Sequence, residues 1–212
     1  MTTTGDAKPG LSRASGNRRR GRPGYDLESL LQVAAKLFYE RGYDGTSMEE
    51  LSRRLGITKS AIYHHVASKE ELLRMSVDRA LDGLFAVAAE VEALPGRAID
   101  KLEHLVRGSV RVLSEQLPFV TLLLRVRGNT KVERTAVARR RQFDRIVADL
   151  VAQAEAEGDI RPDVDPATTA RLLFGMVNSL IEWYQPRRGS DSTALADAVA
   201  KVAFDGIRVP RA

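Results

Sequence analysis

The sequence has 212 residues, a formal net charge of +5 and no cysteine, which excludes disulfides, thiol redox chemistry and cysteine nucleophiles. Only three histidines are present, so a transition-metal site is a poor expectation, and no run approaches the roughly 18 apolar residues of a membrane span. We therefore expect a soluble, intracellular, cytoplasmic protein that needs no cofactor and does not enter a membrane.

The excess positive charge lies at the N-terminus. Residues 1–25 hold six basic residues and one acidic residue, which leaves 27 of each in the rest of the chain. Residues 1–24 are too poor in apolar side chains to form a core, so we predict a disordered basic arm. Its sequence NRRRGRPG resembles the core of an AT-hook, which implies that Arg20 and Arg22 enter the minor groove of A·T-rich DNA. A solubilising tail is the alternative.

From Asp26 onward the apolar residues recur with a helical period, and no segment alternates like a strand. A first helix is predicted to stop at Arg41-Gly42. Ser47 and Glu50 form a capping box, in which the Ser47 oxygen accepts from an amide and Glu50 reaches back. The short helix that they open is predicted to end at Gly56.

A third helix of about two turns is predicted after Thr58, which is a suitable N-cap, with Ile62 and Val66 pointing inward. Ser68 and Glu71 repeat the capping-box pattern and open a long helix. Two short helices joined by a tight turn that contains glycine indicate a helix-turn-helix.

The outer face of this third helix is suited to a polyanion. On a helical wheel Ser60, Tyr63 and His64 point away from the apolar side, and residues 51–69 contain no Asp or Glu. Such a face fits the major groove of DNA; a helical hairpin with a solvated face is the alternative. A metal role for His64 and His65 is not expected, because neighbours on a helix diverge by about 100° and chelation needs residues i and i+4.

The stretch from about Leu27 to Leu73 resembles the TetR family of bacterial transcriptional regulators. The residues in register are Phe38, Gly42, Thr46, Ser47, Leu51, Gly56, Ile62, Tyr63, His65, Lys69 and Leu72. Two positions depart from the family pattern, since Val66 stands where Phe is usual and His64 where another aromatic residue is common. The resemblance implies an all-α fold of about nine helices, with a three-helix helix-turn-helix domain at residues 25–72 and a ligand-binding and dimerisation domain at residues 73–212.

The resemblance also implies roles at the DNA. The residues expected to face base edges are Lys59, Ser60, Ala61 and Tyr63, with Lys59 near guanine acceptors and Ala61 and Tyr63 near thymine methyls. The residues expected to hold phosphates are Thr46, Ser47, His64, His65 and Lys69. Thr58 belongs to the same expected interface. For His65, a hydrogen-bonded packing role is the alternative.

Beyond Met75 the pattern predicts about six helices, with breaks at Leu94-Pro95-Gly96, Leu117-Pro118, Gly128-Asn129, Glu157-Gly158-Asp159 and Gln185-Pro186. Asp165-Pro166 is typical of a helix start. The helix that follows is apolar over too wide an arc for a surface helix, and the final helix repeats this pattern. The family resemblance implies that these two helices form a four-helix dimer interface, which would place two recognition helices on a pseudo-palindromic operator.

A sensor of this type encloses a pocket among its middle helices. Candidate lining residues are Phe119, Leu122, Arg125, Arg127, Phe143, Met176, Asn178 and Trp183, with core packing as the alternative for each. If buried, Arg125 and Arg127 need an anionic partner, either an internal acid such as Glu182 or a ligand carboxylate or phosphate.

The block FGMVNSLIEWYQP resembles a subgroup of regulators of lipid, steroid and phenylacetate catabolism, whose members sense acyl-CoA thioesters. The run Arg139-Arg140-Arg141 is a candidate for a CoA phosphate, with a solvated helix face as the alternative.

We therefore predict a homodimeric, ligand-responsive transcriptional regulator, a repressor released from double-stranded operator DNA by a small-molecule effector such as an acyl-CoA or another hydrophobic anion. An enzyme is a second class, but no Ser/His/Asp arrangement, Gly-rich phosphate loop or metal-ligand spacing supports it. An architectural DNA-binding protein without an effector is a third class. More than half of the chain forms an apolar helical body, which DNA bending does not require.

Overall fold

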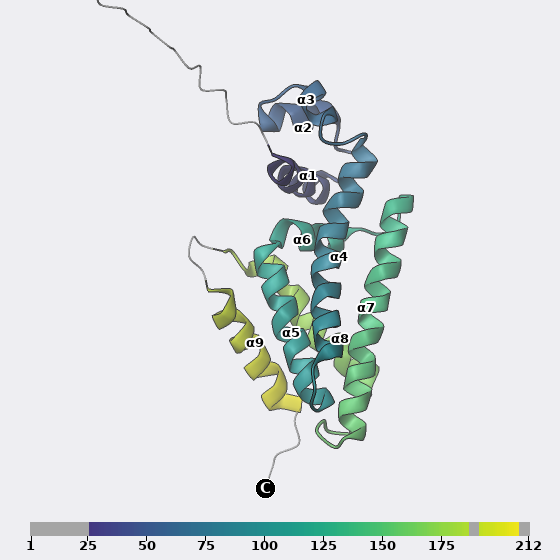
Figure 1. Ribbon diagram of the computed structural model, residues 1–212, viewed down its shortest axis with the longest axis vertical. Coiled ribbons are helices and arrows are strands. Elements are labelled where there is room, and N and C mark those ends of the chain that lie inside the picture. Colours follow the sequence, from purple (N-terminus) through teal and green to yellow (C-terminus); the bar gives the residue numbers. More distant parts are fainter. Residues whose placement is uncertain (1–25, 187–190, 208–212) are drawn as a thin grey trace, which may run out of the picture.

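The computed structural model describes residues 26–186 and 191–207, and within them the fold consists of nine helices (Figure 1). The helices are α1 (Leu27–Arg41), α2 (Met48–Leu55), α3 (Lys59–Tyr63), α4 (Lys69–Ala93), α5 (Ala98–Glu115), α6 (Leu117–Arg125), α7 (Lys131–Ala156), α8 (Pro166–Trp183) and α9 (Ser192–Ile207). Helices α1 to α3 form one end of the molecule, α5 to α9 form the body, and α4 extends through both. The predicted all-α class is confirmed. Arg20 and Arg22 of the basic arm lie outside the described residues.

Helices α2 and α3 begin at the side-chain caps that were predicted, and α2 ends at the predicted glycine. The Ser47 hydroxyl oxygen accepts from the backbone amide of Glu50 (3.1 Å), and the Thr58 oxygen accepts from the amide of Ala61 (3.2 Å). Gly56 ends α2 with φ +65° and ψ +30°, a left-handed conformation that favours glycine. The turn between α2 and α3 is therefore tight.

Two local details differ from the prediction. Helix α3 ends at Tyr63 after five residues rather than about two full turns, because the chain tightens into a turn at residues 64–65. The carboxylate of Glu50 does not close the first capping box. It pairs instead with Arg41 (3.1 Å) and Arg53 (2.5 Å), which hold it against α1 and α2.

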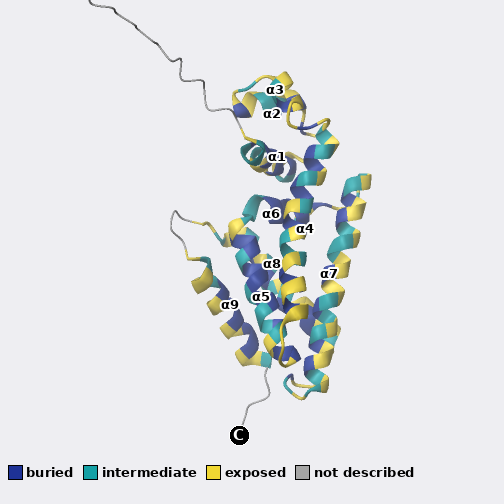
Figure 2. Ribbon diagram, in the orientation of Figure 1, coloured by how far each residue is buried: buried dark blue, intermediate teal, exposed yellow. Residues whose placement is uncertain are grey.

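Helix α4 begins beside α3 and ends at the far end of the body. The Ser68 hydroxyl oxygen accepts from the amide of Glu71 (3.1 Å), and the Glu71 carboxylate accepts from the amide of Ala67 (2.7 Å). The second capping box thus closes one residue earlier than predicted. Buried residues occur along most of the helix, namely Leu72, Leu73, Ser76, Val77, Ala80, Leu81, Val87, Ala88 and Val91. One helix therefore contributes buried side chains from the α1–α3 end to the far end of the body, all within one hydrophobic core (Figure 2).

Helix α5 lies at the centre of the body and packs against α4, α7 and α9. Gly108 permits the close approach of α4, since a Cβ atom at this position would lie 2.3 Å from Cγ1 of Val87. Helix α8 packs mainly on α7 rather than on α9. In the described part of the chain, no helix has the length and apolar character needed to cross a membrane.

Candidate nucleic-acid interface and effector pocket

The outer surface of α3 has the composition that the helical wheel predicted. Lys59, Ser60, Tyr63 and His64 are exposed, with Tyr63 at 51% exposure, whereas Ile62 is fully buried. The helix therefore presents an ammonium, a hydroxyl, a phenol and an imidazole to solvent from one side. These are the groups that contact base edges and phosphates in the major groove.

A shared hydrophobic core fixes the direction in which this surface points. Ile62 is buried together with Leu51 and Leu55 of α2 and Leu72 of α4, and Val66 is 3% exposed. Burying a side chain of this size is worth about 1.5–3 kcal/mol. Helix α3 is short, so these contacts, rather than its own hydrogen bonds, hold it in place.

Lys59 does not project freely from α3. Its Nζ atom lies 2.5 Å from Oε1 of Glu49, which stands in the first turn of α2. The hydrogen bond between the two groups raises the pKa of Lys59 and lowers the pKa of Glu49, so the pair stays charged. Sequence reasoning missed Glu49 as part of this surface. The two residues are ten positions apart, and no helical or strand period connects them.

Lys69, at the first position of α4, holds the turn between α1 and α2. Its ammonium donates to the carbonyl oxygens of Tyr43 and Thr46, each at 2.9 Å, and lies 4.1 Å from the centre of the Tyr43 ring. An ammonium has three protons. Two of them form the hydrogen bonds to Tyr43 and Thr46, and the third can be donated to the predicted phosphate.

Thr46 is buried, with 1% exposure, and this corrects its predicted place among the phosphate contacts. Its hydroxyl donates to the carbonyl oxygen of Gly42 (2.9 Å) and also lies 3.3 Å from the carbonyl oxygen of Leu37. A hydroxyl has one proton to donate, and here α1 already receives it. The side chain of Thr46 therefore stabilises the end of α1.

The remaining predicted phosphate contacts lie at the surface around α3. Ser47, Thr58, His64 and His65 are all exposed, whereas Ala61 is half-buried. The alternative for His65 was a hydrogen-bonded packing role, and its exposure favours the predicted phosphate contact instead. The hydroxyl oxygens of Ser47 and Thr58 accept from backbone amides. This leaves the Thr58 proton for an external acceptor, whereas the Ser47 hydroxyl also bonds to the Glu49 carboxylate.

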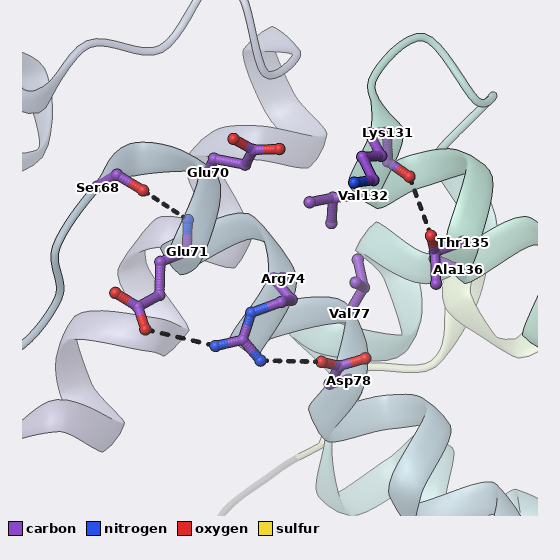
Figure 3. A pocket seen from close by; sticks show the side chains of 10 residues that line it. All are labelled: Ser68, Glu70, Glu71, Arg74, Val77, Asp78, Lys131, Val132, Thr135 and Ala136. Atoms are coloured by element: carbon purple, nitrogen blue, oxygen red, sulfur yellow. Dashed lines mark hydrogen bonds and ion pairs between the residues drawn. The ribbon is translucent and has the colours of Figure 1, made fainter.

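A groove of about 410 Å³ lies between the start of α4 and the start of α7 (Figure 3). On its α4 side, the guanidinium of Arg74 lies 3.4 Å from the carboxylates of both Glu71 and Asp78. Asp78 also pairs with Arg139 of α7 at 2.9 Å. These ion pairs connect α7 to the capped start of α4, next to the recognition helix.

A small cavity of about 30 Å³ lies inside the body among α4 to α8. Phe143 and Phe174 form an edge-to-face pair on its wall, with ring centres 5.5 Å apart. Its polar groups include Asn178, Arg140 and Asp144, and burial raises the pKa of the Asp144 carboxyl against the opposing effect of the Arg140 charge. A volume of this size holds about one or two water molecules, so this conformation is closed to a larger ligand.

A second hollow of about 280 Å³ separates the α1–α2 turn from the end of α6, and Leu122, Arg125 and Arg127 line it. Both arginines are exposed, so the buried environment considered for them is not observed. Arg125 lies 3.6 Å from Glu182 of α8 and 5.5 Å from the centre of the Tyr39 ring of α1. Glu182, the acidic residue of the protein that was suggested as a partner of Arg125, is therefore close to it. The Arg125 side chain connects α6 to α1 and α8.

The predicted pocket residues are not gathered in one place. Phe143 and Asn178 line the internal cavity, and Phe119 is packed in the core at 2% exposure. Met176 faces α9, and Trp183 is 60% exposed. The apolar residues of α8 face different surroundings, because one side of the helix packs on α7 and another faces outward. The sequence pattern alone does not separate these two sides.

The three consecutive arginines of α7 also differ from one another. Arg139 pairs with Asp78 and Asp82 of α4 (2.9 and 2.8 Å), and Arg140 donates to the carbonyl oxygen of Leu123 (3.0 Å). Arg141 is exposed. The alternative of a solvated helix face therefore holds for one of the three, while Arg140 is positioned at the internal cavity.

Helices α8 and α9 expose a band of apolar side chains. Leu172 is 65% exposed and Val202 is 68% exposed, and both line a hollow of about 200 Å³ between the two helices, together with Met176 and Ile207. Exposed apolar surface of this kind is typical of a protein–protein interface.

Two family models match the chain. A model described as "Tetracyclin repressor-like, C-terminal domain" matches residues 95–207, and one described as "Bacterial regulatory proteins, tetR family" matches residues 30–75. The N-terminal match covers α2, α3 and most of α1. The C-terminal match covers α5 to α9.

Individual proteins are also similar to this chain over most of its length. The crystal structure of SCO3833, a member of the TetR transcriptional regulator family from Streptomyces coelicolor A3, is 54% identical, covers 87% of this chain and 94% of its own, and has a TM-score of 0.78. The HTH-type transcriptional repressor KstR2 of Mycobacterium tuberculosis is 27% identical over 80% of this chain and 83% of its own length. AibR, solved with isovaleryl coenzyme A and operator DNA, is 27% identical over 84% and 97% of the two chains, with a TM-score of 0.68.

Proposed function

The chain belongs to the TetR family of bacterial regulatory proteins, and we propose that it is a homodimeric repressor that a small hydrophobic anion releases from a pseudo-palindromic operator. The observation that carries this proposal is the exposed polar and basic side of α3, which itself contains no acidic residue and is supported by buried contacts with α2 and α4. This surface has no evident role within the protein itself. It is suited to the major groove, with Lys59, Ser60 and Tyr63 toward base edges.

A dimer is needed for such an operator, because a pseudo-palindrome offers the same half-site twice. The exposed Leu172, Trp183 and Val202 of α8 and α9 support this assembly. A two-fold interface brings the same patch of each copy together, so one apolar band on each copy is sufficient.

The DNA-binding proposal is tested by selecting sequences from a random duplex library with the full-length protein, followed by titration of the selected duplex and of unrelated DNA. We expect a palindromic consensus, a complex with two protein chains for each duplex, and at least a thousandfold preference over unrelated DNA. An architectural protein would instead show no consensus and would cover any duplex.

For the effector, we propose that the internal cavity is the closed form of the binding site. Ligand pockets for molecules of this class span about 300–1,000 Å³, which the present volume of about 30 Å³ does not provide. A ligand that enters between α7 and α8 must therefore move them. Because α7 is joined to α4 through Arg139 and Asp78, this movement also displaces the helix that supports α3.

A CoA thioester is the effector class that we propose, supported by AibR, whose crystal structure contains isovaleryl coenzyme A, and by the FGMVNSLIEWYQP block. Arg140, positioned at the cavity, is the proposed contact for an anionic group of the ligand. Arg125 and Arg127, beside the outer hollow, are the other candidates.

The effector proposal is tested by adding CoA thioesters of short branched, long straight-chain and steroid-derived acids to the protein–operator complex, with free CoA as a control. We expect one class to release the DNA. Arg140→Ala should raise the required concentration at least tenfold and leave operator affinity unchanged, whereas Arg141→Ala, one position away and exposed, should behave like the wild type. Release that depends on Arg125 or Arg127 but not on Arg140 would place the anionic group in the outer hollow.

A further inference from the structure

The base-reading end of α3 carries a carboxylate as well as an ammonium. Lys59 is the first residue of α3, and Glu49 is the second residue of α2. Their side chains meet at 2.5 Å, and both are at least half exposed, at 50% and 61%. The N-terminal residues of a recognition helix are those that contact base edges. Glu49 therefore stands at the place where bases are read, although it belongs to the preceding helix.

The two groups differ in what they can recognise. An ammonium only donates hydrogen bonds, and an ionised carboxylate only accepts them. Lys59 has three protons and Glu49 has about four acceptor positions, so both keep capacity after they have bonded to each other. The two groups can therefore still form hydrogen bonds with other molecules. It presents a donor beside an acceptor on the surface of the protein.

In the major groove this arrangement matches a G·C pair. Guanine offers two acceptors, O6 and N7, and cytosine offers one donor, the amino group at N4. Lysine is a common partner of guanine O6 and N7, and glutamate accepts from cytosine N4. The N4 and O6 atoms lie side by side in the groove, as the carboxylate and the ammonium do here.

We propose that Glu49 and Lys59 act as one specificity-determining unit that reads a single G·C pair in each half-site, with Lys59 on guanine and Glu49 on cytosine. This inference rests on the proposed function and assigns Glu49 to it. Each group needs the other. Without Lys59, the negative charge of the carboxylate would face the DNA phosphates uncompensated. Without Glu49, the ammonium would donate equally to phosphate oxygens and to any base acceptor.

The experiment is a selection from a random duplex library with the wild type, Glu49→Ala, Lys59→Ala and the double variant. We expect both single variants to lose the preference at the same G·C position, by about 5- to 150-fold for substitution of that pair. The double variant should lose no more than either single variant. Glu49→Ala should also bind unrelated DNA more tightly than the wild type, because it removes a negative charge beside the phosphates.

A matched control is available in Glu40, an acidic residue of α1 that pairs with Lys36 (3.8 Å) and Arg54 (4.0 Å) away from α3. Glu40→Ala changes the charge of the DNA-binding end by the same amount and should leave the consensus unchanged. If Glu49→Ala instead tightens binding to every sequence while the G·C preference persists, Glu49 is only a repulsive charge, and the proposal is overturned.

Direct reading of cytosine is separated from an indirect effect on Lys59 by a modified operator. N4-methylcytosine at the assigned position replaces the groove-facing N–H with a methyl group. Wild-type affinity should fall at least fivefold, and Glu49→Ala affinity should change less than twofold. Equal effects on the two proteins would overturn the proposal. The proposed function has its own criterion, since a wild-type protein that selects no consensus at all would contradict it before Glu49 is considered.

Discussion

At the scale of single residues, the DNA-binding end depends on side chains that each serve two purposes. Lys69 shows this most clearly, because its ammonium bonds to the carbonyl oxygens of Tyr43 and Thr46 and stands over the Tyr43 ring. It therefore fixes the α1–α2 turn to the start of α4. The start of a helix also favours a bound anion, so the same charge is suitably placed for a DNA phosphate.

Lys69→Met should consequently lower both stability and DNA binding. We expect a loss of about 1–3 kcal/mol in the free energy of unfolding, since two hydrogen bonds to a charged donor are removed. Affinity for operator and for unrelated DNA should fall together, and the slope of log K against log salt should become shallower by about one. Lys36→Met is the control. Its ammonium reaches only the exposed Glu40 at 3.8 Å, and the change in stability should stay within about 0.5 kcal/mol.

The candidate site was predictable from the sequence where a local pattern decides exposure. Ser60, Tyr63 and His64 follow from the wheel of one helix, and Thr58 follows from capping. Thr46 and Glu49 did not follow. The burial of Thr46 arises from the fold of the preceding turn onto α1, and the contact of Glu49 with Lys59 arises from the angle between two helices.

At the scale of elements, the boundaries of the helices were also predictable, because capping residues act within a few positions. Ser68 and Asp165 each accept from an amide three residues later, as predicted, and Asp26, for which no cap was predicted, does the same. The partners of each helix were not predictable in this way. Helix α9 packs on α5, and α8 packs on α7, because complementary shapes decide these contacts across long separations in the chain.

The packing of α4 on α5 depends on the absence of a side chain at Gly108. Gly108→Ala places a methyl group 2.3 Å from Cγ1 of Val87, and overpacking of this kind costs about 1–3 kcal/mol. The gain in helix propensity, about 1 kcal/mol, offsets part of this cost. Urea unfolding should therefore show a net loss of up to about 2 kcal/mol. In a Val87→Ala background the same substitution should be neutral or stabilising, and an equal loss in both backgrounds would rule out this contact as the cause.

The outward face of α9 provides a prediction about assembly. Val202→Glu places a charge in the exposed apolar band without disturbing the core, since Val202 is 68% exposed. If this band is the dimer interface, the variant should sediment as a folded monomer at micromolar concentration, because a buried unpaired charge is costly. Lys201→Glu is the control on the neighbouring position, where the side chain is 80% exposed and pairs with Asp205, and it should remain a dimer.

At the scale of the whole molecule, charge is distributed unevenly along the chain. The first 25 residues account for the entire positive excess of the sequence, while the remainder has equal numbers of acidic and basic residues. Non-specific attraction to DNA should therefore depend strongly on the arm. The rest of the chain contributes the proposed sequence-reading surface but no net charge.

Deletion of residues 1–23 should leave folding and dimerisation unchanged and should weaken DNA binding. The slope of log K against log salt should become shallower by several units. Without the arm the protein makes fewer phosphate contacts, so its binding releases fewer counterions. Preference for A·T pairs beside the operator should depend mainly on Arg20 and Arg22. An unchanged slope after the deletion would identify the arm as a passive tail.

Helix α4 supplies buried side chains beside α3 and, further along, in the body, and all of them belong to one hydrophobic core. Its 25 residues form one continuous rod with no break between these two regions. Because side chains from both regions of this rod belong to one hydrophobic core, we expect the two regions to unfold together. The free energy of DNA binding is then spread over the entire protein. Amide hydrogens in α5, far from any nucleotide, should exchange more slowly on the operator, and heating should produce one transition rather than two.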